Sequence, residues 1–490
     1  MMTKYTLGRF RSFLIGLISR IIHYYLVWAY PITDDQGRPI PTCPYQWPNG
    51  QGDRGKFLEG EVNSKVWGAE HGRIYRIWSG MTSEIVVRNP ADIETIFKDS
   101  DKHTKAVNND AGWLMGELLG QCLGLISGGE YQRAKAAFAP HFTHRTSALY
   151  LQRIVEFTKK HVDGLTEKTG PARQTELDPV NDLKFLPFWI IADTLYGELT
   201  AELKDELMRL LELRESLWQM IMQGGIMRYS WGRFIQRGTA RDLERFKKGW
   251  ARFNIAAYNA CASAGQETPI VEMYSRVGDG KLDSEALLQT LDEMLFANLD
   301  VTMGGISWNL LFLAAHKDVQ EQIRQEIAQA RSEAGGQGSL DAYLQRSSTL
   351  LAASILESGR LKPLAAFSVP QAAPTDRRVA GFAVPAGTNF VVDTHALNIE
   401  NPYWGADGSV YRPGRFLAAK RQLDMRYQFW RFGFGPRQCL GKYVVELMGR
   451  ALVAHLLESH ELSLAESTRW EKNPASWIMH PDTHVHCRRI

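Results

Sequence analysis

The stretch Phe432-Gly-Phe-Gly-Pro-Arg-Gln-Cys439-Leu-Gly441 decides the fold of this chain, because it places a single cysteine just ahead of an apolar helix. Residues 442–457 repeat apolar side chains at steps of three and four, which predicts a helix with one buried face. The start of such a helix offers free backbone N–H groups and a positive dipole end, and both stabilise a thiolate. Cys439 is therefore placed to ligate a metal ion. The alternative is an ordinary buried cysteine in a glycine-rich turn.

The neighbours of Cys439 suit a flat macrocycle with an anionic rim. Gly433, Gly435 and Gly441 permit a tight turn and a close approach of the backbone, which a Cβ would obstruct. Arg437 offers a fixed cation for a carboxylate such as a propionate. With a thiolate ligand, these features point to haem iron.

The stretch resembles the haem-binding signature of the cytochrome P450 superfamily, Phe-x-x-Gly-x-Arg-x-Cys-x-Gly, at every defined position. The resemblance implies that haem b is held by Phe432, Gly435, Arg437, Cys439 and Gly441, with Cys439 as the iron ligand. It also implies a monooxygenase that activates dioxygen and inserts one oxygen atom into an organic substrate.

A second motif of the same family lies upstream. Glu357 and Arg360 stand one helical turn apart, so that carboxylate and guanidinium can pair, although such pairs are common on solvated helices. The resemblance adds Arg415, in Tyr411-Arg-Pro-Gly-Arg415-Phe416, as the third member of a triad. We expect this triad to be structural and to lock the core that carries the cysteine loop.

The rest of the chain predicts a mainly α protein with small β-sheets. The resemblance implies the cytochrome P450 fold, with the haem between a long central helix and the helix after the cysteine loop. Short β-rich segments predict one small sheet, formed by 74–78, 85–87, 382–384 and 390–392. Helical periodicity predicts helices over 150–165, 181–197, 200–222, 240–261, 284–315, 317–333 and 349–361, the long one capped by Asp283.

The central helix departs from the family. The family has Ala/Gly-Gly-x-Asp/Glu-Thr-Thr/Ser there, and its acid and first threonine relay protons to bound dioxygen. This chain has Ala297-Asn-Leu-Asp300-Val301-Thr302, in which Val301 can neither donate a proton nor hold a water. Thr302 lies about 100° further round the helix, so it reaches the same place only if Gly304-Gly305 distort the helix. The alternative is that Thr302 bonds back to a carbonyl.

These three positions, Asp300, Val301 and Thr302, are the candidate catalytic residues. Because Val301 replaces a proton donor, protons must come from Asp300, from Thr302, from ordered water or from the substrate. We hypothesise that the substrate radical is sometimes diverted from hydroxylation to desaturation, ring closure or aryl coupling.

The haem edge also departs from the family. The family's Trp-x-x-x-Arg, which contacts a propionate, corresponds to Tyr131-Gln-Arg-Ala-Lys135. A phenol and an ammonium can still bond a carboxylate, although lysine lacks the bidentate fork of arginine. A solvated basic helix end is the alternative for Lys135. Gln371 stands where many members have Arg or His, so haem retention is expected to depend more heavily on Arg437.

Composition excludes several other classes of protein. The 490 residues contain no linker after about residue 60, and the net charge of +3 is spread without a basic stripe, which argues against nucleic-acid binding. Five scattered cysteines without a Cys-x-x-Cys argue against a disulfide framework and a zinc site, and indicate a reducing compartment. We expect a monomer.

The N-terminus predicts membrane attachment. Residues 13–30 are almost entirely apolar, follow Lys4, Arg9 and Arg11, and precede five prolines. They resemble the anchor and hinge of microsomal members, which implies an anchor over 1–30, a Pro-rich hinge over 31–56 and a catalytic domain over 57–490. This places the catalytic domain on the cytosolic face of the endoplasmic reticulum. Arg20 and His23 leave open whether the helix spans the membrane or lies in its interface. A cleaved signal peptide is the alternative, but no cleavage site precedes Pro31.

The chain has no Gly-x-Gly-x-x-Gly motif beside a βαβ unit, so its electrons must come from a separate protein. The resemblance implies NADPH and NADPH-cytochrome P450 reductase. A basic docking face for that partner is predicted from Lys420, Arg421, Arg426, Arg431 and Lys442.

The substrate is expected to be an apolar or aromatic small molecule. By analogy with the family, the pocket would be lined from residues 105–125 and 208–231, although many of their side chains suit an ordinary core. These candidates are Trp113, Leu114, Met115, Leu118, Trp218, Met220 and Met222. The chain is similar to fungal secondary-metabolism members, such as those acting on cyclic dipeptides. A haem-thiolate isomerase or dehydratase that needs no dioxygen, and a non-catalytic haem sensor, are the other two classes of function.

Overall fold

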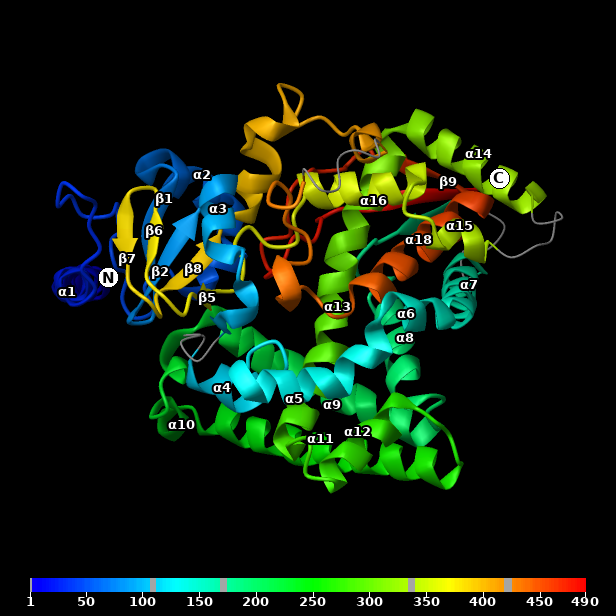
Figure 1. Ribbon diagram of the computed structural model, residues 1–490, viewed down its shortest axis with the longest axis horizontal. Coiled ribbons are helices and arrows are strands. Elements are labelled where there is room, and N and C mark those ends of the chain that lie inside the picture. The colour runs from blue at the N-terminus through cyan, green and yellow to red at the C-terminus, as the bar shows by residue number, and fades with distance from the viewer. Residues whose placement is uncertain (1, 106–111, 168–173, 334–339, 418–424) are drawn as a thin grey trace.

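The computed structural model describes residues 2–105, 112–167, 174–333, 340–417 and 425–490, and in the terminal helix it describes side chains from Ser12 onward (Figure 1). Helices form most of it. They are α1 (Met2–Ala29), α2 (Gly60–His71), α3 (Pro90–Phe97), α4 (Trp113–Leu119), α5 (Gly128–Phe138), α6 (His144–Leu149), α7 (Leu151–Glu167), α8 (Phe185–Tyr196), α9 (Ala201–Gln223), α10 (Gly232–Ile235), α11 (Arg237–Ser263), α12 (Pro269–Gly278), α13 (Ser284–Ala315), α14 (Lys317–Glu333), α15 (Asp341–Gln345), α16 (Leu350–Leu361) and α18 (Lys442–Ser459).

Three small sheets accompany the helices. The largest has the order β1-β2-β8-β5-β3, the second has the order β4-β10-β9, and β6 and β7 form a hairpin. Their bounds are β1 (Ile74–Ser79), β2 (Thr82–Val87), β3 (Thr104–Lys105), β4 (Gln174–Leu177), β5 (Gln371–Ala372), β6 (Arg377–Val379), β7 (Phe382–Val384), β8 (Asn389–Val392), β9 (His460–Leu464) and β10 (Val485–Arg489). The mainly α class with small sheets is confirmed.

One strand assignment was wrong. The prediction placed 382–384 in the sheet of β1 and β2, but β7 pairs with β6 instead, in the register Val379↔Phe382. Ala380 and Gly381 have φ of 51° and 90° and form a two-residue turn between the two strands. Such a turn closes a local hairpin at a small entropic cost, and this outweighs pairing with a distant sheet. The segment 390–392 does join the predicted sheet, as β8 parallel to β2.

The long helix α13 runs through the centre of the molecule, with α9, α11 and α12 on one side and α14, α16 and α18 on the other (Figure 1). Its side chains are buried around most of its circumference, which is typical of a helix inside the core. Asp283 caps it as predicted, since its carboxylate accepts the N–H of Ala286 at 2.9 Å. The helix is continuous through Gly304 and Gly305, so the suggested distortion does not occur.

The predicted triad is assembled in the core. Both nitrogens Nε and Nη2 of Arg360 donate to the carboxylate of Glu357 at 2.8 Å, and Nε of Arg415 donates to the same carboxylate at 3.1 Å. All three side chains are buried. Nη1 of Arg360 also donates to the carbonyl of Asn398 at 2.9 Å. The triad therefore ties α16 to the chain segment that leads into the cysteine loop.

Candidate functional site

The cysteine loop runs through the short turn Gly435–Arg437 into α18, and backbone bonds close it. The N–H of Cys439 donates to the carbonyl of Phe432 at 2.8 Å. Gly435 has a φ of 68°, and a Cβ there would lie 2.1 Å from Oγ of Ser100. Only glycine fits such a position. The spacing of glycines in the loop is thus a requirement of its conformation.

The thiol of Cys439 is accessible although protein surrounds it. The other four cysteines are buried, whereas Cys439 is exposed. Burial nevertheless raises the pKa of Cys439, while the N–H of Gly441 bonds the sulfur and lowers it. A Cβ added at Gly441 would meet no atom within 4 Å. Cys439 is therefore exposed beside the open space at Gly441, and a metal cation bound to its sulfur would displace the proton of the thiol.

Three predicted residues meet at the edge of this loop. The guanidinium of Arg437 lies 3.9 Å from the ring centroid of Tyr131, and its Nη2 donates to the carbonyl of Ile126 at 2.8 Å. The ammonium of Lys135 and the hydroxyl of Tyr131 both donate to the carbonyl of Pro436, at 3.3 and 3.5 Å. The helix α5 thus brings a phenol and an ammonium to the guanidinium that the cysteine loop supplies.

A further cation of this edge was missed by the sequence analysis. Lys105 in β3 is the register partner of Gln371 in β5. Burial, and then the charge of Arg437, lower the pKa of Lys105 to about 8. Oε1 of Gln371 is buried without a hydrogen-bond partner. No local motif distinguishes Lys105, because only the pairing of β3 with β5 brings it to this place.

These residues fit a haem. Its iron requires an accessible thiolate, and its two propionates require cations and hydrogen-bond donors. Cys439 can supply the thiolate. Lys105, Tyr131, Lys135 and Arg437 can supply the cations and the hydrogen-bond donors.

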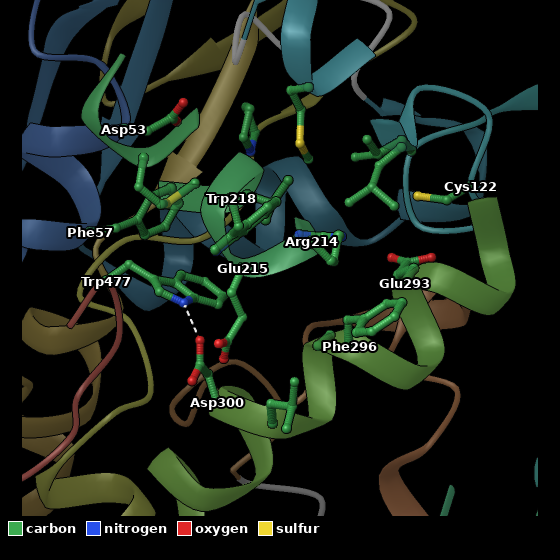
Figure 2. Close-up of a pocket in the computed structure, with 18 residues that line it drawn as sticks. Asp53, Phe57, Cys122, Arg214, Glu215, Trp218, Glu293, Phe296, Asp300 and Trp477 are labelled. Carbon is green, nitrogen blue, oxygen red and sulfur yellow. Dashed lines mark hydrogen bonds between the residues drawn. The ribbon is translucent and has the colours of Figure 1, made fainter. Parts of the chain in front are cut away.

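The face of α13 toward the cavity carries Glu293, Ala297 and Asp300, which follow at steps of four and three residues. Nε1 of Trp477 donates to Oδ2 of Asp300 at 2.8 Å (Figure 2). Nε2 of His480 donates to the backbone carbonyl of Asp300 at 2.9 Å. Asp300 is thus held by the chain that follows β9.

The other two candidate catalytic residues lie differently. The hydroxyl of Thr302 is buried and donates to Oδ1 of Asn298 at 2.7 Å. The amide of Asn298 in turn donates to the carbonyl of Met294. The side chain of Val301 is apolar and can form no hydrogen bond. The structure therefore presents Asp300 to the cavity and binds Thr302 within the helix.

Two side chains of α13 also hold the neighbouring loop that follows α4. The N–H of Leu123 donates to Oγ1 of Thr290 at 3.0 Å, and the N–H of Gly124 donates to Oε2 of Glu293 at 3.0 Å. Glu293 also accepts a hydrogen bond from the thiol of Cys122, and burial raises its pKa. A Cβ at Gly124 would lie 1.9 Å from Oε1 of Glu293. This part of the cavity wall is therefore attached directly to the central helix.

A cavity of about 230 Å³ lies beside Asp300 (Figure 2). Most of its lining is apolar or aromatic, but carboxylates and one guanidinium reach it. The lining residues are Asp53, Phe57, Met115, Leu119, Cys122, Leu125, Arg214, Glu215, Trp218, Met222, Glu293, Phe296, Ala297, Leu299, Asp300, Val369, Pro370 and Trp477.

Three of the seven predicted pocket residues, Met115, Trp218 and Met222, line this cavity. Leu114 and Leu118 are core residues instead. Trp113 and Met220 pack partly buried against the core. Phe57 and Trp477 also line the cavity and were not predicted, because they come from distant parts of the chain. Their rings pack edge to face, with 6.4 Å between the ring centroids.

Comparison with known proteins agrees with this geometry. The family model described as Cytochrome P450 matches residues 60–488. The chain is 50% identical over 469 residues to cytochrome P450 monooxygenase aclC of Aspergillus oryzae, covering 94% of this chain and 95% of that one. It is 45% identical to cytochrome P450 monooxygenase asaD of Aspergillus flavus, over 96% and 91% of the two chains.

A third relative is cytochrome P450 monooxygenase gliC of Aspergillus fumigatus, which is 38% identical over 97% of this chain and 94% of its own. The names of these relatives favour a haem-thiolate monooxygenase over an isomerase and over a sensor. With a match across 60–488 and relatives that align over nearly their whole length, the chain belongs to the cytochrome P450 family.

Proposed function

We propose that this protein is a membrane-bound monooxygenase that oxidises an apolar or aromatic intermediate of fungal secondary metabolism. The observation that carries the proposal is the exposed Cys439 just before α18, two residues from a glycine whose missing side chain leaves open space. The residues 57–490 form its catalytic domain, joined by the segment 31–56 to the N-terminal anchor.

Haem held at this site would supply oxygen activation, which a thiolate ligand favours. Cys439 would be its ligand, and Arg437, Tyr131, Lys135 and Lys105 would hold its propionates. Phe432, Gly435 and Gly441 shape the loop around it. The repulsion between Lys105 and Arg437, which adds to the effect of burial in lowering the pKa of Lys105, supports the assignment, since a bound anion would relieve it.

Asp300 is the group that holds and moves protons at this site. Its carboxylate lines the cavity and is oriented by Trp477, whereas the hydroxyl of Thr302 is occupied by Asn298. Val301 leaves the helix without the family's hydroxyl at that position. Hydroxylation and oxidative ring closure or coupling are both open to such a site, and the substrate geometry decides between them.

Electrons come from NADPH through cytochrome P450 reductase, which docks on the basic face beside the cysteine loop. Arg426 is exposed, and the ammonium of Lys442 donates to the side chain of Gln438 at 2.9 Å and lies 4.8 Å from the ring centroid of Tyr443. Arg431 contributes less, because it pairs with Glu446 at 3.4 Å. Lys420 and Arg421 lie outside the described residues.

Attachment to the endoplasmic reticulum, with the catalytic domain in the cytosol, rests on α1. Ser12–Ala29 is long and apolar enough to cross a membrane, and little of it is buried. It also contacts the hinge, since Oγ of Ser19 accepts the N–H of Trp47 at 3.0 Å. Trp231, Phe234 and Ile235 near α10 are a second group of exposed apolar side chains.

The test replaces Cys439 by alanine in the producing organism and compares the masses of the lost product and the accumulated precursor. A product heavier by one oxygen indicates hydroxylation, and a loss of two hydrogens or a dimer indicates ring closure, desaturation or coupling. Purified protein must require dioxygen and reductase for the same conversion. Turnover without either would contradict the proposal and favour the isomerase or dehydratase.

A further inference from the structure

Arg214 is a buried cation in the wall of the cavity, and three contacts fix its position. Nε donates to Oδ1 of Asp292 at 2.8 Å. The guanidinium carbon lies 4.9 Å from the ring centroid of Trp218 and 5.8 Å from that of Phe296. Figure 2 shows Arg214 beside both rings at the cavity. Stacking between aromatic rings and pairing with a carboxylate leave the guanidinium little freedom.

The terminal amino groups of Arg214 donate to no acceptor among the residues that the structure describes. The only hydrogen bond of the side chain within those ranges uses Nε. The side chain is 6% exposed, and that exposure is toward the cavity. Donors that face the cavity without a protein acceptor are available to a ligand that carries a suitable oxygen.

The charge of the cavity argues that this oxygen belongs to a neutral group. Four carboxylates line the same space, those of Asp53, Glu215, Glu293 and Asp300. Burial and the repulsion from Asp300 raise the pKa of Glu215, which indicates that negative charge is already disfavoured there. An anionic ligand in this cavity would lose its hydration and would be repelled by these carboxylates. A carbonyl oxygen accepts the same hydrogen bonds without that cost.

We propose that Arg214 is the specificity-determining residue that binds a carbonyl oxygen of the substrate, and that the substrate is an uncharged aromatic carbonyl compound. The aromatic part lies against Trp218, Trp477 and Phe57, which form edge-to-face contacts around the same space. This inference rests on the proposed function, because it takes the cavity beside Asp300 as the substrate site.

The experiment compares two probes of the same shape, 2-acetylnaphthalene and 2-isopropenylnaphthalene, which differ only by a carbonyl oxygen in place of a methylene. Their affinities for the purified holoenzyme are measured by calorimetry. We expect the wild type to bind the ketone at least about tenfold more tightly, the range of a hydrogen bond to a charged donor. A third probe, 2-naphthoate, should bind more weakly than the ketone.

The variant is Arg214→Met combined with Asp292→Leu, because Arg214→Met alone would leave a buried carboxylate unpaired. The double variant should lose the preference for the ketone and still bind the hydrocarbon. Asp292→Asn alone keeps the guanidinium and should keep the preference.

Equal affinities in the wild type, or a preference that persists in the double variant, would overturn the assignment of Arg214. Tighter binding of 2-naphthoate than of the ketone would overturn the neutral acceptor. Binding is measured without turnover, so a failed Cys439→Ala experiment in the producing organism would refute the proposed function separately.

Discussion

The indole of Trp477 donates a hydrogen bond of 2.8 Å to the carboxylate of Asp300, and the same indole forms part of the cavity wall. The acid of the central helix is therefore oriented by a side chain that a substrate would touch. A neutral donor of this kind holds a carboxylate in place and leaves its negative charge intact, whereas a basic residue would neutralise that charge.

Trp477→Phe keeps an aromatic ring in the wall and removes the donor. We expect the yield of product per NADPH consumed to fall by roughly tenfold, since a hydrogen bond to a charged group is worth about 1.5 to 3 kcal/mol. The measurement is product and hydrogen peroxide formed from the accumulated precursor. Trp218→Phe is the control, because Trp218 lines the cavity without bonding Asp300. Equal losses in both variants would assign Trp477 to packing alone.

Val301→Thr restores the hydroxyl that the family has at this position. We expect less peroxide per NADPH and a larger share of simple hydroxylation, by severalfold, because a donor one residue from Asp300 can hold a water for proton transfer. Val301→Ala, which changes volume without adding a hydroxyl, is the control. An unchanged product distribution and peroxide leakage would refute the idea that Val301 redirects the radical.

Lys105→Met removes one cation from the cluster beside the cysteine loop. We expect haem to transfer to an excess of apomyoglobin about tenfold faster, because a charge-assisted hydrogen bond to a propionate is lost. Lys98→Met, at an exposed site outside this cluster, should leave the transfer rate unchanged. Identical rates for the two variants would exclude Lys105 from the haem site.

Glu357→Gln leaves Arg360 and Arg415 without their shared carboxylate. Breaking a fully buried ion pair costs about 3 to 5 kcal/mol, so we expect a large drop in unfolding temperature and loss of haem during expression. Glu272→Gln is the control, because its pair with Arg276 is partly exposed and is worth less than about 1 kcal/mol. A stability of Glu357→Gln equal to that of the control would show that the triad does not hold the core.

The titration of Lys472 should make the free energy of unfolding depend on pH in the alkaline range. Burial lowers its pKa from 10.5 to about 8, and its ammonium donates to the carbonyl of Leu58 at 3.1 Å. A lysine whose pKa is lower in the folded protein contributes stability above the unfolded pKa, and this contribution is lost as pH falls through the folded pKa. As the pH rises from about 8 to about 10.5, the free energy of unfolding of the wild type should therefore increase relative to that of Lys472→Gln, by on the order of 1 kcal/mol. Thermal unfolding of both proteins across this range measures it. A difference that is constant with pH would contradict the prediction.

Features that depend on residues close together in the sequence could be predicted. The conformation of the cysteine loop follows from its glycines, and helix bounds follow from periodicity, as for α13, predicted over 284–315 and found over Ser284–Ala315. The triad needed one further motif. Each of these depends on residues close in sequence or on a spacing that the family repeats.

What escaped prediction depends on tertiary packing. Lys105 reaches the edge of the cysteine loop because β3 pairs with β5, and Trp477 reaches Asp300 across the fold, 177 positions away along the chain. Neither pairing leaves a local pattern. The partner of Thr302 was equally undecidable, because a carbonyl and the side chain of Asn298 both lie one turn earlier on the helix.

The contact between Gly124 and Glu293 has a consequence for how the cavity wall can move. A Cβ at position 124 would collide with the carboxylate at 293, and the two positions are 169 residues apart. A side chain introduced at 124 would push this carboxylate aside and break its hydrogen bond with the N–H of residue 124. The glycine is thus a spacer, and its small size lets one buried glutamate fasten the loop after α4 to the central helix.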